Sequence, residues 1–228
     1  MNTQDVLDLI EEGEGFHVEF KRKVPSPQKI AKSLIAFANT RGGCILFGVD
    51  DDGSIIGVES EKEEVELIKT AGNVFCDPPV PVHIDIVGYN GKDVIVATVE
   101  ESREKPHFFR NDGDETAPPK AYIRVHDKSV LASREVVRLL HDEDPDAPPL
   151  RISIGENERF LFRFLDTHER ITLREFAHLV NISERRASRI LVRLVRAGVI
   201  RIHTEEKEDF YTLAQDLKPP QANELFSR

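Results

Sequence analysis

Tryptophan is absent from this sequence of 228 residues, methionine occurs once, and cysteine occurs twice, as Cys44 and Cys76. Two cysteines are too few for a disulfide framework or a cysteine-based zinc site, so we expect two buried thiols. No apolar run reaches the roughly 18–20 residues that would span a bilayer. The acidic, amphipathic stretch from Met1 to Glu12 does not have the composition of a secretory signal. We therefore expect a cytoplasmic protein with no membrane partner.

One stretch of the sequence has almost nothing to bury. Residues 142–149 read Asp-Glu-Asp-Pro-Asp-Ala-Pro-Pro, and this acidic, proline-rich run cannot continue a helix. Apolar residues make up 39% of the whole chain, which is enough for the cores of one or two domains. The sequence therefore predicts two domains, with these boundaries: a first domain at 1–141, a linker at 142–151, a second domain at 152–214 and a tail at 215–228.

The net charge of −10 is distributed unevenly. Residues 1–150 carry a net charge of −12 and residues 151–228 carry +2. Within this acidic chain, residues 20–41 contain no acid, and residues 183–201 contain six arginines and one glutamate. Basic segments in an acidic protein are typical of a directed electrostatic surface for a polyanion, although each could also be an ordinary solvated face. The bases of the first segment are Lys21, Arg22, Lys23, Lys29, Lys32 and Arg41.

The second domain shows a helix-turn-helix pattern. Thr172 and Glu175 form a capping box at one helix start, and Ser183 is the N-cap of the next helix, which ends at Gly198. Because about three residues separate these two short helices, they make a helix-turn-helix. A preceding helix and a following hairpin complete a winged helix. The expected elements are helices at 156–166, 172–180 and 183–197 and strands at 199–203 and 210–213.

This pattern resembles the winged helix-turn-helix families of bacterial regulators. The resemblance implies that the second helix lies in the major groove, with Arg185, Arg186 and Arg189 contacting bases or phosphates and Arg193 contacting the backbone. The hairpin tip at 204–209 carries four acids and one base, so phosphate would repel it. The alternative is that the winged helix serves dimerisation or protein docking.

The first domain alternates helices with hairpins. Helices are expected at 1–12, 62–75 and 133–141, and another begins after the N-cap Ser26 and ends at Ala38. Asn90-Gly91 is a strong hairpin signal between two strands. This order predicts an α+β fold with a mixed or mainly antiparallel sheet and flanking helices. The expected strands are 16–20, 44–49, 54–58, 80–87, 93–99 and 121–125.

Two segments of the first domain resemble the AlbA-type Schlafen domain. They are Glu14-Gly15-Phe16-His17-Val18-Glu19-Phe20-Lys21 and the run from Ile35 to Gly53, which contains Ala-Phe-Ala-Asn-Thr-Arg-Gly-Gly and Gly-Val-Asp-Asp-Asp-Gly. Tyr122-Ile123-Arg124-Val125 also fits. The resemblance covers about residues 1–140 and implies nucleic-acid binding. Bacterial members of this family often carry a C-terminal winged helix.

The same resemblance suggests a nuclease as an alternative. Some Schlafen domains cleave RNA with an acidic triad, and Glu14, Glu19 and Asp51 occupy the corresponding positions here. Convergent carboxylates could hold Mg²⁺ or Mn²⁺, which polarises a phosphoryl oxygen, and Lys21 could hold the scissile phosphate. Because Glu19 alternates with Val18 and Phe20, the simpler expectation is a solvent-facing strand residue.

An older description of such domains as divergent ATPases suggests nucleotide sensing as a second alternative. The sequence contains no Gly-x-x-x-x-Gly-Lys-Ser/Thr motif, so it lacks a phosphate cradle with its lysine. Gly42-Gly43 precedes a strand and is expected to be a turn that needs positive φ.

Taken together, the sequence predicts a regulator-like protein that binds DNA, with RNA as the alternative, and it leaves metal-dependent RNA cleavage open as an alternative activity. The arginine helix would read the duplex, and the first domain would add a second surface. Because a single helix-turn-helix is small, we expect a homodimer on a two-fold site. No cofactor is expected outside the nuclease alternative. The residues of the second surface are Lys21, Arg22, Lys23, Lys29 and Lys32.

Overall fold

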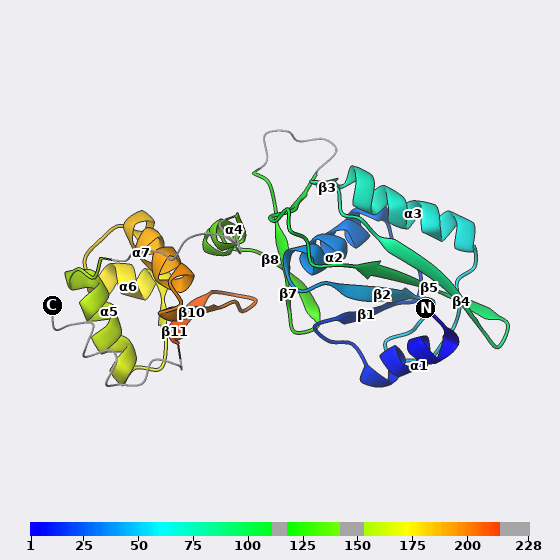
Figure 1. The fold of residues 1–228 in the computed structure, drawn as a ribbon, viewed down its shortest axis with the longest axis horizontal. Helices are drawn as coiled ribbons and strands as arrows, with labels where there is room; N and C mark the ends of the chain where they lie inside the picture. The colour runs from blue at the N-terminus through cyan, green and yellow to red at the C-terminus, as the bar shows by residue number, and fades with distance from the viewer. Residues whose placement is uncertain (111–117, 142–152, 215–228) are drawn as a thin grey trace. The chain divides into compact units, whose positions relative to one another are not determined.

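The computed structural model describes residues 1–110, 118–141 and 153–214 of the chain. The chain divides into two compact units, Met1–Ala132 and Ser133–Arg228 (Figure 1). The expected linker at 142–151 and the expected tail at 215–228 lie outside the described residues.

The first unit is built on a four-stranded sheet with the strand order β1-β2-β5-β4. Strand β1 (Val18–Lys21) runs parallel to β2 (Gly43–Phe47). Strand β5 (Lys92–Val99) runs antiparallel to both β2 and β4 (His83–Tyr89). Asn90 and Gly91 both have positive φ in the turn between β4 and β5, as their sequence predicted. The sheet is therefore mixed, and the predicted α+β class is confirmed.

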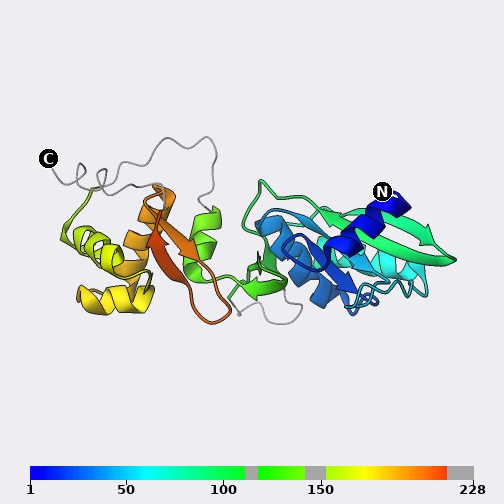
Figure 2. The ribbon, with the colours of Figure 1, turned by 90° about the horizontal axis from the view of Figure 1, so that it is seen from below.

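Helices cover both faces of this sheet. Helices α2 (Pro27–Asn39) and α3 (Glu61–Val74) lie on one face, and α1 (Thr3–Glu12) lies on the other (Figure 1). Figure 2 shows α1 in front of the sheet and α3 behind it. Alternate residues of β2 face the two layers, since Ile45 packs under α2 and Leu46 packs with α1. Ser26 caps α2 as predicted.

Two short strand pairs extend the first unit beyond the sheet. Strand β3 (Cys76–Asp77) pairs with β6 (Phe108–Phe109), and β7 (Tyr122–Val125) pairs with β8 (Lys128–Leu131). The sequence predicted β7 but not β3, β6 or β8. Because a two-residue strand shows no alternation to read, β3 and β6 have no periodic signal.

The predicted strand at 54–58 is not formed. A single bridge joins Val49 to Ile55, and the backbone then turns at Gly57, where φ is +79°. The N–H groups of Ile56 and Gly57 both donate to the carbonyl of Gly48, so this segment folds over the end of β2 instead of pairing along it.

The turn at Gly42 and Gly43 needs glycine, as the sequence predicted. Their φ values are +70° and +158°. A Cβ on Gly42 would lie 2.7 Å from the carbonyl oxygen of Val99, and a Cβ on Gly43 would lie 2.4 Å from the Phe37 ring. This close approach lets α2 pack directly against the strands that follow the turn.

The second unit packs helices against a small antiparallel sheet. Helices α5 (Glu156–Thr167), α6 (Leu173–Leu179) and α7 (Glu184–Arg196) surround a core that includes Leu161, Phe176 and Leu191. The predicted capping box of Thr172 and Glu175 is present, and Ser183 caps α7. The sheet has the order β10-β11-β9, formed by β10 (Ile200–His203), β11 (Phe210–Leu213) and β9 (Ile171–Thr172).

Helix α4 (Arg134–His141) belongs to this second unit. The sequence prediction placed it at the end of the first domain, and this assignment is wrong. Its buried residues Val136 and Leu140 lie on a helix that packs against α7, and its polar side chains hydrogen bond to Ser188 of α7. The boundary therefore falls between Ala132 and Ser133, nine residues earlier than the predicted end at 141.

Candidate nucleic-acid interface

Helix α7 separates its apolar and basic side chains. Ala187 and Leu191 are fully buried against the core of the second unit. On other sides of the helix, Arg185, Arg186 and Arg189 are exposed, and none of them forms an ion pair with any described residue. Three guanidinium groups on one capped helix therefore face solvent without an ion-pair partner among the described residues, which favours binding to a polyanion.

Arg193 is in a different situation from the other three. Its Nη2 lies 2.7 Å from Oε1 of Glu158, a carboxylate whose side chain is only 8% exposed. The other oxygen of Glu158 accepts the backbone N–H of Gly155 at the start of α5. Arg193 therefore joins α7 to α5, a structural role that the sequence prediction missed.

A groove of about 560 Å³ runs between the start of α5 and this side of α7. Its basic lining comes from Arg186, Arg189 and Arg193 on α7. Ile182 and Ile190 provide its apolar lining. The first turn of α5, residues 155–158, forms the opposite wall.

The other flank of α7 is covered by α4. Ser188 and Val192 of α7 are only 3% and 8% exposed. The hydroxyl of Ser188 donates to Glu135 and accepts from Arg138, both at 2.6 Å. The side of α7 that could contact nucleic acid therefore lies between α4 and the groove. Arg185 and Arg189 are exposed there.

The connection between β10 and β11 carries the acidic residues noted in the sequence. Glu205, Glu206 and Glu208 are exposed, whereas Asp209 is half-buried and accepts the Ser133 hydroxyl from the start of α4. Burial raises the pKa of Asp209, and the hydrogen bond from Ser133 partly opposes that shift. The surface here stays acidic, so the expectation that phosphate would repel it fits the described side chains.

The basic segment of the first unit is partly neutralised. Lys21 lies 2.9 Å from Glu19, and Arg22 lies 2.6 Å from Asp50. In contrast, no described carboxylate pairs with Lys23, Lys29 or Lys32. The ammonium of Lys32 lies 5.7 Å from the ring centres of both Phe109 and Tyr122, and such aromatic faces attract a cation without cancelling its charge. Three of the five predicted cations, Lys23, Lys29 and Lys32, are therefore available to contact a polyanion.

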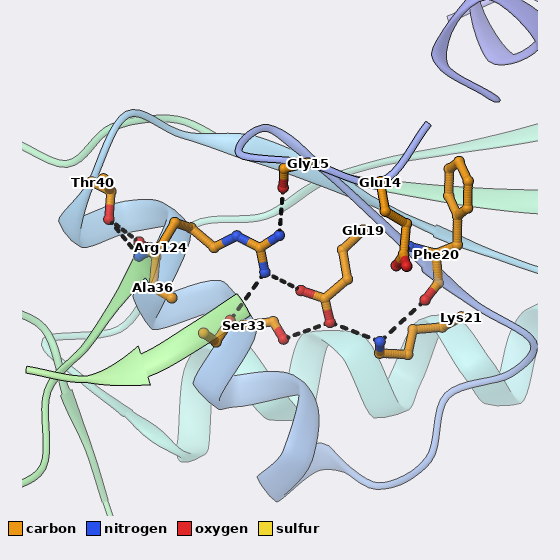
Figure 3. A network of polar contacts seen from close by, with 10 residues as sticks. Glu14, Gly15, Glu19, Phe20, Lys21, Ser33, Ala36, Thr40 and Arg124 are labelled. Carbon is orange, nitrogen blue, oxygen red and sulfur yellow. Dashed lines mark hydrogen bonds and ion pairs between the residues drawn. The ribbon is translucent and has the colours of Figure 1, made fainter. Parts of the chain in front are cut away.

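Glu19 lies in the interior of the first unit, so the expectation that it faces solvent is wrong. One of its oxygens accepts from Arg124 at 2.6 Å, and the other accepts from Ser33 at 2.9 Å and pairs with Lys21. Figure 3 shows the carboxylate enclosed by these groups. The alternation in β1 fails as a guide because β7 and α2 cover the face that would otherwise meet water.

The other two members of the predicted triad do not join Glu19 in a metal site. Glu14 accepts the backbone N–H of Phe20 at 2.8 Å, and Asp51 is exposed in the turn after β2. Within residues 1–110, 118–141 and 153–214, no group of three His, Cys, Asp or Glu side chains is arranged to hold a metal ion. Since Glu19 already has cationic and hydroxyl partners on both oxygens, these residues do not fit Mg²⁺ or Mn²⁺.

The residues that organise this region include two that sequence reasoning did not single out. Arg124 donates to Glu19, Ser129 and the Gly15 carbonyl, and its guanidinium carbon lies 4.6 Å from the Phe37 ring centre. Asn39 donates to the carbonyls of His107 and Tyr122, and it accepts the His107 N–H. An arginine within the apolar strand 121–125 was the available signal, because a charge there needs a buried partner.

Residues 14–133 match the family model described as Schlafen, AlbA_2. The chain belongs to the Schlafen AlbA_2 family. The match confirms the resemblance of the first domain to the AlbA-type Schlafen domain, and it ends at the boundary between the two units. In the AlbA_2 domain of this chain, the Ala-Phe-Ala-Asn-Thr-Arg-Gly-Gly motif provides Asn39, Thr40 and the tight turn at Gly42.

Two solved structures resemble parts of this AlbA_2 protein. The first is the N-terminal domain of a protein from Nitrosomonas europaea described as related to the ATP-dependent DNA helicase RecG; identity is 23%, coverage is 53% of this chain and 88% of the other, and the TM-score is 0.42. The second is the DIP2311 protein of Corynebacterium diphtheriae, with 18% identity, coverage of 67% and 36%, and a TM-score of 0.44. No curated protein matches the chain.

Among the described helices of this AlbA_2 protein, none combines the length and the apolar character needed to cross a membrane.

Proposed function

We propose that this protein is a nucleic-acid-binding, regulator-like protein whose second unit is a winged helix domain that binds duplex DNA through α7. The observation that carries the proposal is the exposure of Arg185, Arg186 and Arg189, which have no ion-pair partner among the described residues. The order of α5, β9, α6, α7, β10 and β11 supports the winged helix assignment. Residues at the N-terminal end of α7 would meet base edges, and Arg189 would meet the backbone.

Fluorescence anisotropy with a labelled duplex tests this proposal. The unmodified protein should bind with an affinity that falls steeply as salt increases, because phosphate contacts release counterions. The triple variant Arg185→Ala, Arg186→Ala and Arg189→Ala should bind at least about tenfold more weakly, since each base-contacting arginine is worth about 1–3 kcal/mol.

The matched control removes the same charge from the same unit. Arg159 and Arg163 on α5 and Arg170 before β9 are exposed and lie outside α7 and the groove. A triple alanine variant at these three positions should retain duplex binding within about threefold of the unmodified protein, since only long-range charge is lost. Equal losses in both triple variants would refute α7 as the binding surface.

The first unit would contribute a second nucleic-acid surface through Lys23, Lys29 and Lys32, with Lys21 and Arg22 committed mainly to their carboxylate partners. Replacing the three free lysines with alanine should lower the slope of log affinity against log salt by about 1 for each lost phosphate contact. The control triple variant replaces Lys62, Lys69 and Lys92 of the same unit and should leave the slope unchanged. An unchanged slope in the first variant would remove this surface from the proposal.

A homodimer on a two-fold site completes the proposal, because one helix-turn-helix covers less DNA than a specific site requires. Sedimentation of the protein with and without duplex measures the stoichiometry, and one chain per saturated duplex would exclude the dimer. Metal-dependent RNA cleavage gains no support from the site, since Glu19 is held by Arg124, Ser33 and Lys21. Nucleotide sensing gains none either, and calorimetric titration with ATP is its direct test.

A further inference from the structure

We propose that the groove between α5 and α7 is a binding site for a phosphoryl anion. This site extends the proposed function. It rests on that function only where the bound phosphate belongs to a DNA backbone. A free phosphorylated ligand is the other source of the same chemistry.

The charge balance of the groove favours an anion. Of the two carboxylates that line it, Glu158 is paired with Arg193 through one oxygen and accepts the Gly155 N–H with the other. Arg186 and Arg189 have no described partner, so their charge exceeds that of the remaining carboxylate, Glu156. Guanidinium groups bind phosphoryl oxygens through paired N–H bonds, which makes arginine well suited to this ligand.

The wall formed by α5 adds hydrogen-bond donors to this charge. Helix α5 begins after Gly155, which has no side chain to accept the N–H groups of the first turn. The residues of that turn, 155–158, line the groove beside the arginines of α7.

Arg193 also lines the groove, and its side chain is 41% exposed. Its Nη2 donates to Glu158, so the charge of Arg193 is largely committed to that carboxylate. The volume of about 560 Å³ lies within the roughly 300–1,000 Å³ range of small-molecule sites, so more than a single phosphate has room.

Asn157 gives a variant that tests the groove without altering α7. It lines the groove from the first turn of α5, and Asn157→Asp introduces a negative charge where the ligand would lie. An aspartate in the first turn of a helix stabilises the helix, so the variant should fold. The charge-matched control is Asn90→Asp, because Asp-Gly forms the same hairpin turn as Asn-Gly and Asn90 lies outside the groove.

The experiment measures pyrophosphate binding by calorimetry and duplex binding by anisotropy, with the full chain and both variants. We expect pyrophosphate to bind the unmodified protein and Asn90→Asp alike, and to bind Asn157→Asp at least about tenfold more weakly. If duplex binding falls in parallel, the DNA backbone uses the site; if it does not, a free phosphorylated ligand does. A loss of duplex binding in Asn157→Asp alone, without pyrophosphate binding, also supports the site.

Two results would overturn the proposal. The first is pyrophosphate binding of equal strength in all three proteins, which would place the anion elsewhere. The second is no pyrophosphate binding together with duplex binding that Asn157→Asp leaves unchanged. Pyrophosphate binding that is sensitive to Asn157→Asp in a protein that binds no duplex would leave the phosphoryl site standing and would refute only the DNA-binding function.

Discussion

The guanidinium of Arg124 lies 2.6 Å from the carboxylate of Glu19, although 105 positions separate them in the sequence. Both side chains are buried, at 1% and 8% exposure, so this ion pair ties β7 to β1 inside the first unit. Removing Arg124 leaves the buried Glu19 carboxylate with the half-exposed Lys21 as its cation, and removing Glu19 leaves the buried Arg124 without a carboxylate, so either loss costs more than the net value of the pair.

We predict that Arg124→Met lowers the free energy of unfolding by about 3–5 kcal/mol. The double variant Glu19→Gln with Arg124→Met should cost less than the two single variants added together, because neither charge is then left unpaired. Urea unfolding followed by circular dichroism measures these values. Arg22→Met, which breaks the exposed pair with Asp50, is the control and should cost under about 1 kcal/mol. Equal losses for Arg124→Met and Arg22→Met would contradict the prediction.

The contact between α4 and α7 makes a second prediction. Ser188→Ala removes the hydroxyl that joins Glu135 and Arg138, and we expect it to lower the free energy of unfolding by about 1–3 kcal/mol. The exposed Ser153 supplies the control, since Ser153→Ala should change stability by less than about 0.5 kcal/mol. Two identical urea unfolding curves would show that α4 does not rest on α7 in solution.

The burial of Asp209 predicts a pH dependence. Its pKa is raised above the ordinary 3.8, chiefly by desolvation, so the folded protein keeps this proton to a higher pH than the unfolded chain. The contribution of Asp209 to stability therefore falls as pH rises from 3.8 through the raised value, and it is constant above that. The difference in unfolding free energy between the protein and Asp209→Asn should fall over this window. With the exposed Glu208→Gln as control, a flat difference for Asp209→Asn would contradict the assigned burial.

The two thiols provide a prediction about reactivity. Burial raises the pKa of Cys44 to about 11 and that of Cys76 to about 12. Because the thiolate is the reactive form, a disulfide reagent at mildly alkaline pH should react roughly 100-fold more slowly with Cys44, and more slowly still with Cys76, in the folded protein than in urea. The single variants Cys44→Ser and Cys76→Ser assign the two phases. Rapid reaction of either thiol without denaturant would show that its surroundings open readily.

Much of the fold could be predicted because its strongest signals are local. The caps at Ser26, Thr172 and Ser183 and the Asn90-Gly91 turn depend on residues a few positions apart, and the structure has all of them. The segment 54–58 shows where local signals fail. It was predicted as a strand, but its backbone turns at Gly57 because the N–H groups of residues 56 and 57 bond to the Gly48 carbonyl.

The candidate site was harder to predict because its partners are distant in sequence. The arginines of α7 were identifiable from their spacing, but the pairing of Arg193 with Glu158 joins two helices 35 positions apart. Glu19 was read as exposed because its covering residue, Arg124, comes from a strand that the pattern of β1 cannot reveal. The placement of α4 failed for the same reason, since its amphipathic pattern does not say which core it faces.

The position of α4 determines how the second unit can be isolated. A recombinant fragment that starts at residue 152 would lack α4 and would uncover Val192 and the Ser188 hydroxyl on the flank of α7. We expect this fragment to self-associate through the newly exposed side of α7. Its oligomeric state would therefore not report the oligomeric state of the full chain. A fragment that starts upstream of Ser133 keeps the intact unit.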